Sequence, residues 1–474
     1  MCLLAMLLLM PLEALRALKS LTVLTAMAAM AALIALTALP ASADGWHIVP
    51  IETQGSTGEY TSIALDQDDH PHIAYYNNTE GGLKHAWFDG VDWQIEMVDA
   101  GDNVGWWTSI AIDSNGHPHI AYYDFPSSAL KYARHDGAAW HIQFLDSAGY
   151  VGDYTSIALD SQDRPHISYR YYVTYGDSDL KYARFDGSSW HLELVDTAGE
   201  VGAWSSIEID GEDRPHIAYY DATGSDLKYA RFDGAQWQIE TIDAQGETGL
   251  WLSLDLDSLD KPHLSYCCYS AYDLKYAHFD GAQWQIETVN AAGQVGWYSS
   301  IAVDGADRPH IACWDMAGND LDYAHWDGQA WQYETVHAQY DVGNWASIAV
   351  DSHNQPHIAY EYNYFGDLYY AWYEASAGVW VGPEGPEIPS DVIRWHAAYP
   401  NPARPSCTIG FALAAESAVR LAVYDLLGRC VRVPVEATIG AGDHTVVIEL
   451  LTPGVYFYEL EAGSAARSGR IVVE

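Results

Sequence analysis

Aromatic residues recur at a nearly constant spacing along most of the chain, each just before a short run of strand-forming residues. The series is Tyr60, Trp107, Tyr154, Trp204, Trp251, Tyr298 and Trp345, and two copies add a second aromatic residue, Trp106 and Trp297. Aspartates stand later in three copies, at Asp124, Asp221 and Asp315. Aromatic rings stack on the apolar face of a sugar, and carboxylates accept hydrogen bonds from its hydroxyls. These residues are therefore candidate ligand-binding residues for a glycan.

The aromatic series also has a purely structural explanation. Because an aromatic residue stands at this position in all seven copies, the side chains can serve as packing between neighbouring units. Residues that differ between copies are better candidates for function, and Trp106, Trp297, Arg170 and Glu361 are of this kind. Both interpretations remain open from the sequence.

The aromatic residues belong to a repeat that predicts the fold. The dipeptide Pro-His ends at His72, His119, His166, His216, His263, His310 and His357, in steps of 47 residues with one step of 50. Each copy holds four short runs rich in β-branched and aromatic residues, and in six copies Asp-Gly between the last two runs indicates a hairpin. Four strands per repeat of this length are typical of a propeller blade. Residues 44–380 are therefore predicted to form a seven-bladed β-propeller.

The two ends of the repeat predict how the propeller closes. Residues 46–52 resemble the fourth strand of a copy, with no first three strands before them. The last copy has its first three strands within residues 345–373, but its fourth strand is cut short. We expect residues 46–52 to complete this last blade, which would remove the exposed sheet edges.

The N-terminus has the features of an export signal. Arg16 and Lys19 precede an apolar run, and Ala41-Ser42-Ala43 is a small-residue cleavage motif. The sequence predicts a signal peptide over residues 1–43, cleaved after Ala43. No second apolar span follows, so no stable membrane span is expected once the signal has been removed.

Charge and cysteine content restrict the partners and the compartment. The net charge is −43, which argues against nucleic acid and anionic membrane as partners. Export permits disulfides, and Cys267 and Cys313 occupy adjacent columns of the second strand in neighbouring copies. Adjacent columns point to opposite sheet faces, and opposite faces of neighbouring blades meet. A disulfide between the two cysteines is therefore one alternative.

A different pattern follows the repeat. Residues 381–390 form a linker rich in proline, and residues 391–474 alternate like strands with no helical pattern. Their motifs are Tyr399-Pro400-Asn401-Pro402, Leu421-Ala422-Val423-Tyr424-Asp425-Leu426-Leu427-Gly428-Arg429, Pro453-Gly454-Val455-Tyr456 and Gly469-Arg470-Ile471-Val472-Val473. This set resembles the C-terminal sorting domain of the type IX secretion system and the related immunoglobulin-like domain of flagellar hook-capping proteins.

The resemblance carries expectations about fold and location. It implies a small immunoglobulin-like β-sandwich that the outer-membrane secretion machinery recognises. It also implies that the propeller is secreted or held on the outer surface of a Gram-negative-type bacterium. The fold class expected for the whole chain is all-β, a seven-bladed propeller followed by this sandwich.

The propeller itself has looser resemblances. The hairpin Phe185-Asp186-Gly187-Ser188-Ser189-Trp190 is similar to the Asp-box turn of sialidase-type propellers, and the repeat length and tryptophan placement resemble lectin propellers. A sialidase needs clustered arginines for its carboxylate substrate. Most arginines here follow the repeat and only Arg170 departs from it, which argues against a sialidase.

Metal binding has two candidate sources. The Pro-His histidines stand one to a blade and cannot share an ion, so we interpret them as buried, hydrogen-bonded side chains. Turns such as Asp160 to Asp163 could bind calcium through oxygen, but each offers too few ligands, and turn capping is the better interpretation. No cofactor is expected, with calcium as the open alternative.

Three functions remain. The first is a secreted or surface-displayed protein that binds glycans through the aromatic loop face. The second is a hydrolase or lyase that acts on polysaccharide with two carboxylates across a cleft. The third is an adhesive or structural scaffold with a protein partner. Near-identity of the copies favours binding or scaffold over catalysis, because a catalytic site needs asymmetry, and no catalytic residue is assigned.

Overall fold

The structure is a computed structural model. It describes residues 45–374 apart from 175, 339, 340 and 365. Beyond these it describes residues 393–395, 406–413, 417–425, 429–440, 442–449, 454–462 and 465–473. The expected signal peptide with its cleavage site at Ala43, and the linker 381–390, lie outside the described residues. Within the part that is described, no helix is long and apolar enough to span a membrane.

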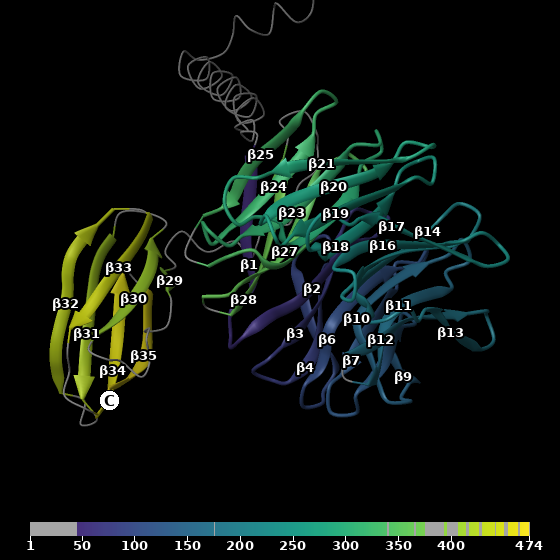
Figure 1. Cartoon of the computed structure of the whole chain (residues 1–474). Helices are drawn as coiled ribbons and strands as arrows, with labels where there is room; N and C mark the ends of the chain where they lie inside the picture. Colours follow the sequence, from purple (N-terminus) through teal and green to yellow (C-terminus); the bar gives the residue numbers. More distant parts are fainter. Residues whose placement is uncertain are drawn as a thin grey trace, which may run out of the picture. The chain divides into compact units, whose positions relative to one another are not determined.

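Seven four-stranded sheets form the blades of a propeller, as the repeat predicts (Figure 1). Blade 1 contains β2 (Thr57–Leu65), β3 (Pro71–Asn77), β4 (Gly82–Phe88) and β5 (Trp93–Asp99). Blade 2 contains β6 (Val104–Ile112), β7 (Pro118–Asp124), β8 (Ala129–His135) and β9 (Trp140–Asp146). Blade 3 contains β10 (Tyr150–Leu159), β11 (Pro165–Thr174), β12 (Asp177–Phe185) and β13 (Trp190–Asp196).

The remaining blades repeat this arrangement. Blade 4 contains β14 (Val201–Ile209), β15 (Pro215–Asp221), β16 (Asp226–Phe232) and β17 (Trp237–Asp243). Blade 5 contains β18 (Thr248–Leu256), β19 (Pro262–Cys268), β20 (Asp273–Phe279) and β21 (Trp284–Asn290). Blade 6 contains β22 (Trp297–Val303), β23 (Pro309–Asp315), β24 (Asp320–Trp326) and β25 (Trp331–His337). Blade 7 contains β26 (Asn344–Val350), β27 (Pro356–Tyr362), β28 (Asp367–Glu374) and the N-terminal β1 (Gly45–Glu52).

The first strand of each blade lies at the centre of the ring. Each of these inner strands contacts the inner strands of both neighbouring blades, so that β2 meets β6 on one side and β26 on the other. β1 lies beside β28, so blade 7 combines the two ends of the propeller sequence. Beside this pairing, His47 Nε2 lies 3.1 Å from Glu374.

A belt of serine side chains joins the inner strands. Each serine Oγ accepts a hydrogen bond of 3.1 to 3.2 Å from a backbone N–H of the next blade. The pairs are Ser62 with Ile110, Ser109 with Ile157, Ser156 with Ile207, Ser206 with Leu254, Ser253 with Ile301, Ser300 with Ile348 and Ser347 with Ile63. The last pair joins blade 7 to blade 1, so the belt passes without a break around the propeller.

A second belt, of lysines and acids, lies between the blades. At five interfaces a lysine of the third strand binds a carboxylate at the end of the preceding blade's outer strand. The pairs are Lys84 with Glu52, Lys131 with Asp99, Lys181 with Asp146, Lys228 with Asp196 and Lys275 with Asp243. A buried tyrosine hydroxyl donates to the same carboxylate at each interface. The acids and lysines therefore enter the interfaces with their charges compensated.

Aspartates shape both kinds of turn within a blade. In the hairpin of blade 3, Asp186 Oδ1 accepts the backbone N–H groups of Ser188 and Ser189, both at 2.8 Å. In the turn before the second strand, Asp160 Oδ1 accepts two backbone N–H groups. Asp163 of that turn accepts the N–H of Ser114 in blade 2 at 2.9 Å. Turn capping is thus confirmed for Asp186 and Asp160, whereas Asp163 links two blades.

Cys267 and Cys313 are both buried free thiols in the structure, so the disulfide considered for them is not formed. Cys267 Sγ instead lies 3.8 Å from the backbone oxygen of Val295. Burial raises the pKa of the Cys313 thiol well above its usual range. Both thiols are therefore protonated packing groups at neutral pH.

The C-terminal part forms two antiparallel sheets. One contains β29 (Ile393–Trp395), β30 (Ser406–Leu413) and β33 (Gly442–Glu449). The other contains β32 (Cys430–Ile439), β31 (Ser417–Asp425), β34 (Gly454–Ala462) and β35 (Ala465–Val473). Leu421, Val423 and Leu460 are completely buried. The small β domain expected after the propeller is therefore present, and the described chain is all-β.

Candidate functional site

The seven repeated aromatic residues meet in one continuous ring. Each is half-buried and contacts the aromatic residue of both neighbouring blades. The ring-centroid distances are 5.3 Å for Tyr60–Trp107, 5.0 Å for Trp107–Tyr154, 5.0 Å for Tyr154–Trp204, 5.5 Å for Trp204–Trp251, 5.8 Å for Trp251–Tyr298, 4.4 Å for Tyr298–Trp345 and 4.1 Å for Trp345–Tyr60. These side chains therefore gather at the centre of the propeller, where they form a common surface.

An unusual backbone conformation holds these aromatic side chains. All seven have a positive φ, between 47° for Trp107 and 55° for Tyr60. The left-handed region is unfavourable for bulky residues, and such residues cluster at functional sites. The position two residues earlier is glycine in every blade, and a Cβ on Gly105 would lie 2.9 Å from the Cα of Leu83 in the neighbouring blade. The chain thus maintains the same strain in every blade to present these rings.

The two additional aromatic residues extend this ring outward. Trp106 stacks on Tyr60 at 5.6 Å and on Phe125 at 4.8 Å. Trp297 lies 4.1 Å from Trp251 and 6.2 Å from Trp314. All nine aromatic candidates therefore lie in one connected cluster.

The three candidate aspartates have a different role. Asp124, Asp221 and Asp315 end the second strands and cap the turns that follow them. Their Oδ1 atoms accept the N–H groups of Ser127, of Thr223 and Gly224, and of Ala317. Asp124 Oδ2 also lies 3.5 Å from Lys131 Nζ. Local backbone geometry accounts for these carboxylates, and no contact joins them to the aromatic ring in the described chain.

The positions beside the aromatic ring vary between blades. The residue before each ring member pairs across to the second strand, through a bulge that shifts the register. The pairs are Glu59 with Tyr76, Trp106 with Tyr123, Asp153 with Arg170, Ala203 with Tyr220, Leu250 with Cys267, Trp297 with Trp314 and Asn344 with Glu361. A uniform ring is therefore bordered by seven dissimilar pairs, and this border supplies the asymmetry that specific recognition needs.

One border pair is a buried ion pair. Arg170 Nη2 lies 2.5 Å from Asp153 Oδ2, and the guanidinium lies over the rings of Tyr154 and Tyr172, 4.6 and 4.0 Å from their centroids. Burial raises the pKa of Asp153, and the charge of Arg170 opposes that effect. The ion pair with Asp153 thus holds the Arg170 guanidinium against the aromatic ring.

Another border pair lines a cavity. Glu361, Asn344, Trp345, Tyr298 and Glu59 are among the residues around a space of about 440 Å³. Burial, followed by the charges of Glu59 and other acids, raises the pKa of Glu361 to about 8. Burial also raises the pKa of Glu59. At neutral pH Glu361 is therefore a protonated acid that can donate a hydrogen bond into the cavity.

The Pro-His histidines are hydrogen-bonded within their blades. His119 Nδ1 lies 2.7 Å from the hydroxyl of Tyr132, and its Nε2 lies 3.6 Å from Asp113. Across the described residues, one group brings three metal-type ligands together, namely Asp69, Asp351 and His353. Asp69 already accepts the N–H and hydroxyl of Ser352. Calcium binding stays an untested prediction.

The comparisons with known proteins address the C-terminal domain first. Residues 397–474 match the family model described as the secretion system C-terminal sorting domain. The C-terminal domain is a type IX sorting domain. The sorting domain indicates secretion through this system, to the cell surface or the extracellular space of a Bacteroidetes-type bacterium. No curated protein matches the chain.

Solved structures resemble the propeller at low sequence identity. An ulvan lyase of polysaccharide lyase family PL25, bound to -[GlcA(1-4)Rha3S]-, has a TM-score of 0.50 and 14% identity, covering 68% of this chain and 95% of its own. A mutant of AofleA from Arthrobotrys oligospora has a TM-score of 0.43 and 12% identity, covering 63% and 91%. A protein of unknown function from Dyadobacter fermentans has a TM-score of 0.45 and 10% identity, covering 70% and 99%. The likeness to the ulvan lyase shows the propeller fold alone.

Proposed function

We propose that the propeller is an exported glycan-binding module and that the aromatic ring with its border pairs is the binding surface. One observation carries the proposal: seven bulky residues are held at positive φ so that their rings meet at one place. Simple packing would not require a strained backbone in every blade. Half-buried rings suit the apolar face of a sugar, and nearby polar groups suit its hydroxyls.

The cavity at Glu361 is the best candidate for the recognition of one sugar unit. Tyr298 and Trp345 are among its lining residues, and polar groups such as Asn344 and Glu361 make up most of its exposed surface. The volume of about 440 Å³ lies within the usual range for small-ligand sites. Because Glu361 is protonated at neutral pH, it donates a hydrogen bond to a sugar oxygen and adds no negative charge.

A glycan array probed with the exported full-length chain tests this proposal, first with calcium and then with a chelator. We expect a restricted set of glycans to bind. The substitution Glu361→Gln keeps the shape and a donor, and should preserve binding, whereas Trp345→Ala should weaken it at least about tenfold. Trp93→Phe, on the outer strand β5 of blade 1, is the matched control. A blank array, or equal binding by the Trp345 variant, would remove the glycan assignment and favour a protein partner or scaffold role.

A second candidate function follows from the same cavity. A protonated Glu361 near the more acidic Glu59 is a combination that acid–base cleavage of a polysaccharide could use. This function predicts that reducing ends or unsaturated products accumulate when the chain is incubated with a bound polysaccharide. Glu361→Gln would then abolish turnover while preserving binding, and the activity would fall as the pH rises through about 8.

A further inference from the structure

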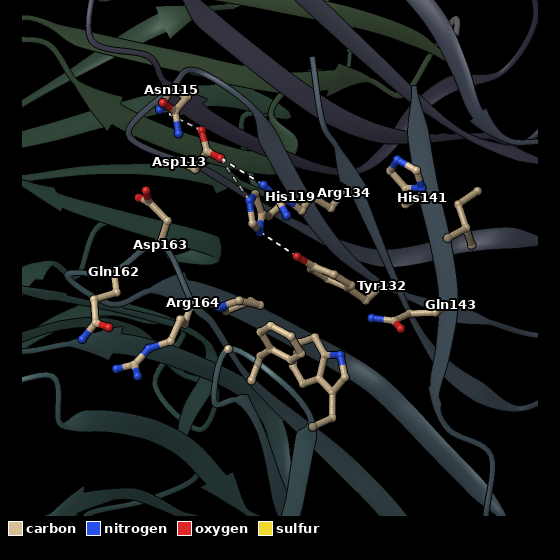
Figure 2. Close-up of a pocket in the computed structure, with 15 residues that line it drawn as sticks. Asp113, Asn115, His119, Tyr132, Arg134, His141, Gln143, Gln162, Asp163 and Arg164 are labelled. Atoms are coloured by element: carbon tan, nitrogen blue, oxygen red, sulfur yellow. Dashed lines mark hydrogen bonds and ion pairs between the residues drawn. The ribbon is translucent and has the colours of Figure 1, made fainter. Parts of the chain in front are cut away.

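A second kind of cavity lies between neighbouring blades, away from the aromatic ring. Figure 2 shows the cavity between blades 2 and 3, with Arg134, His119 and Asp113 on one wall and Arg164 and Asp163 on the other. Its volume is about 490 Å³. A cavity of about 730 Å³ lies at the equivalent place between blades 4 and 5. The repeat therefore builds the same site more than once.

Each of the two cavities has a cation from both of its blades. Between blades 2 and 3 these are Arg134 of β8 and Arg164 of the turn before β11. Between blades 4 and 5 the equivalent residues are Arg231 and Lys261. At the intervening interface, the sequence places Arg184 and Arg214 at the same positions. Three successive interfaces thus share one pattern.

These positions hold nearly all the basic residues of the propeller that lie outside the inter-blade belt. Arg164 and Arg214 also pair with acids of their own turns, Asp160 and Asp210. Five of the propeller's lysines are bound to acids in the inter-blade belt, and Arg170 is bound to Asp153. The remaining basic residues of 45–374 are those six cavity cations and Arg308, which holds the position of Arg164 in a later blade. In a chain of net charge −43, this concentration of cations is selective.

The acids of the cavity wall are already engaged by the protein. Asp113 Oδ1 accepts the N–H groups of Asn115 and His117. Asp163 accepts the N–H and hydroxyl of Ser114. Arg134, by contrast, is 48% exposed, and its Nη2 approaches Asp113 only to 3.9 Å. Its guanidinium can therefore bind an anion that enters the cavity.

Apolar side chains line one part of the cavity, beside polar ones such as Gln143 and Gln162. Trp190, Phe185 and Ile142 line the space between blades 2 and 3. The Trp190 ring lies 5.2 Å from Tyr132 and 5.5 Å from Phe185, which fixes its orientation. An indole beside two guanidinium groups fits a sugar ring that carries an acidic substituent, whereas a simple inorganic anion would leave the apolar surface uncovered.

We propose that the cavities between blades 2 and 5 bind the acidic sugars of an anionic polysaccharide. The carboxylate or sulfate lies between the two cations, and the sugar ring lies against the tryptophan. Because cavities lie at two of these interfaces and the sequence repeats the cation pair between them, one polymer occupies several sites at once and gains avidity. This site is separate from the aromatic ring and does not depend on the function proposed there.

The test measures binding of the exported full-length chain to polygalacturonate, to dextran sulfate and to neutral dextran. We expect at least one acidic polymer to bind and neutral dextran to be inactive. Affinity should fall about tenfold or more between 50 and 300 mM NaCl, because the contacts are ionic and exposed. Free galacturonic acid should bind about a hundredfold more weakly than its polymer if carboxylates are preferred. The comparison of polygalacturonate with dextran sulfate shows whether the cavities prefer a carboxylated or a sulfated polymer.

Variants link the binding to the cavities. The double variant Arg134→Gln, Arg231→Gln should bind the acidic polymer at least tenfold more weakly. The double variant Arg134→Lys, Arg231→Lys keeps both charges and should retain most of the original affinity. Arg429→Gln combined with Arg432→Gln makes the same charge change in the sorting domain and should have no effect. Thermal unfolding verifies that each variant folds. Unchanged affinity in the cavity variant, equal loss in the sorting-domain variant, or binding to neither acidic polymer would overturn the proposal.

Discussion

The interface between blades 1 and 2 and the interface between blades 5 and 6 use the same three positions differently. Between blades 1 and 2, Asp99 accepts hydrogen bonds from Lys131 and from the Tyr122 hydroxyl. Between blades 5 and 6 the three positions hold Asn290, Asp322 and Cys313. The acid, the cation and the tyrosine have all been replaced together.

The difference shows that the residues carrying the buried charges of an interface are replaced together. Where the lysine is absent, the acid it would have bound is absent too. The new carboxyl, Asp322, is 2% exposed and accepts the Tyr333 hydroxyl at 2.7 Å. Burial raises its pKa to about 6. The regular positions of this inter-blade belt thus follow the needs of packing.

The largest effect is expected from breaking the regular interface. Lys131→Met should lower the free energy of unfolding by about 2–3 kcal/mol, because it leaves the mostly buried Asp99 without its cation. Urea unfolding measures the loss. Adding Asp99→Asn should recover part of it, since the interface of blades 5 and 6 carries an amide there. Lys261→Met, outside the belt, is the control. A double variant less stable than Lys131→Met alone would contradict the inference that the acid and the lysine depend on each other.

A smaller effect is expected at an irregular pair of acids on the inner strands. Glu208 and Asp255 stand where the other five blades carry alanine. Burial raises the pKa of both, that of Asp255 to about 6. The native state therefore holds protons that the unfolded state releases, and stability falls as the pH rises from about 4 through 6.

Glu208→Ala should consequently stabilise the propeller, by on the order of 1 kcal/mol at pH 8. The gain should shrink towards pH 4, where the native state keeps both carboxyls protonated and the unfolded state holds them about half protonated. Thermal melts at the two pH values measure it, and Ala158→Ser in a regular blade is a control for substitution at the same position. A gain that is equal at both pH values would point to packing and not to charge.

The smallest effect is expected at the interface of blades 5 and 6. Asp322→Asn retains an acceptor for the Tyr333 hydroxyl and removes a group whose pKa is raised to about 6. Stability linked to this carboxyl is present at low pH and is lost as the pH rises through about 6. The variant should be more stable by less than about 1 kcal/mol at pH 8, and nearly unchanged at pH 4. A stability loss at pH 8 would mean that Asp322 is ionised and needed.

The period of the sequence predicted the propeller because each strand and turn is specified locally. Asp186-Gly187 forms its hairpin with backbone groups only two and three residues away. The lysine and acid belt was not predicted, although Lys131 and Asp99 recur visibly in the repeat. Their contact joins two blades, and the order of residues in the sequence does not specify which strand end lies against which lysine.

The candidate site was predicted in part, for a similar reason. The sequence marked the aromatic ring members and drew attention to Arg170 and Glu361 because they differ between copies. It did not reveal Glu59 or Asn344, since the bulge that brings each border pair together depends on the positive φ of the next residue. Nor did it show that Asp124 caps its own turn, because a carboxylate at a strand end can either bind a ligand or accept local backbone N–H groups.

The hydrogen bond between Ser347 and Ile63 has a consequence for how the chain folds as it is synthesised. It joins residues 284 positions apart, and the contact of Leu368 with Thr57 spans 311. Neither can form until nearly the entire propeller has been synthesised, and contacts so distant in sequence make folding slow. The inner strand of blade 1 must therefore wait for blade 7, and the ring closes only after most of the propeller has left the ribosome.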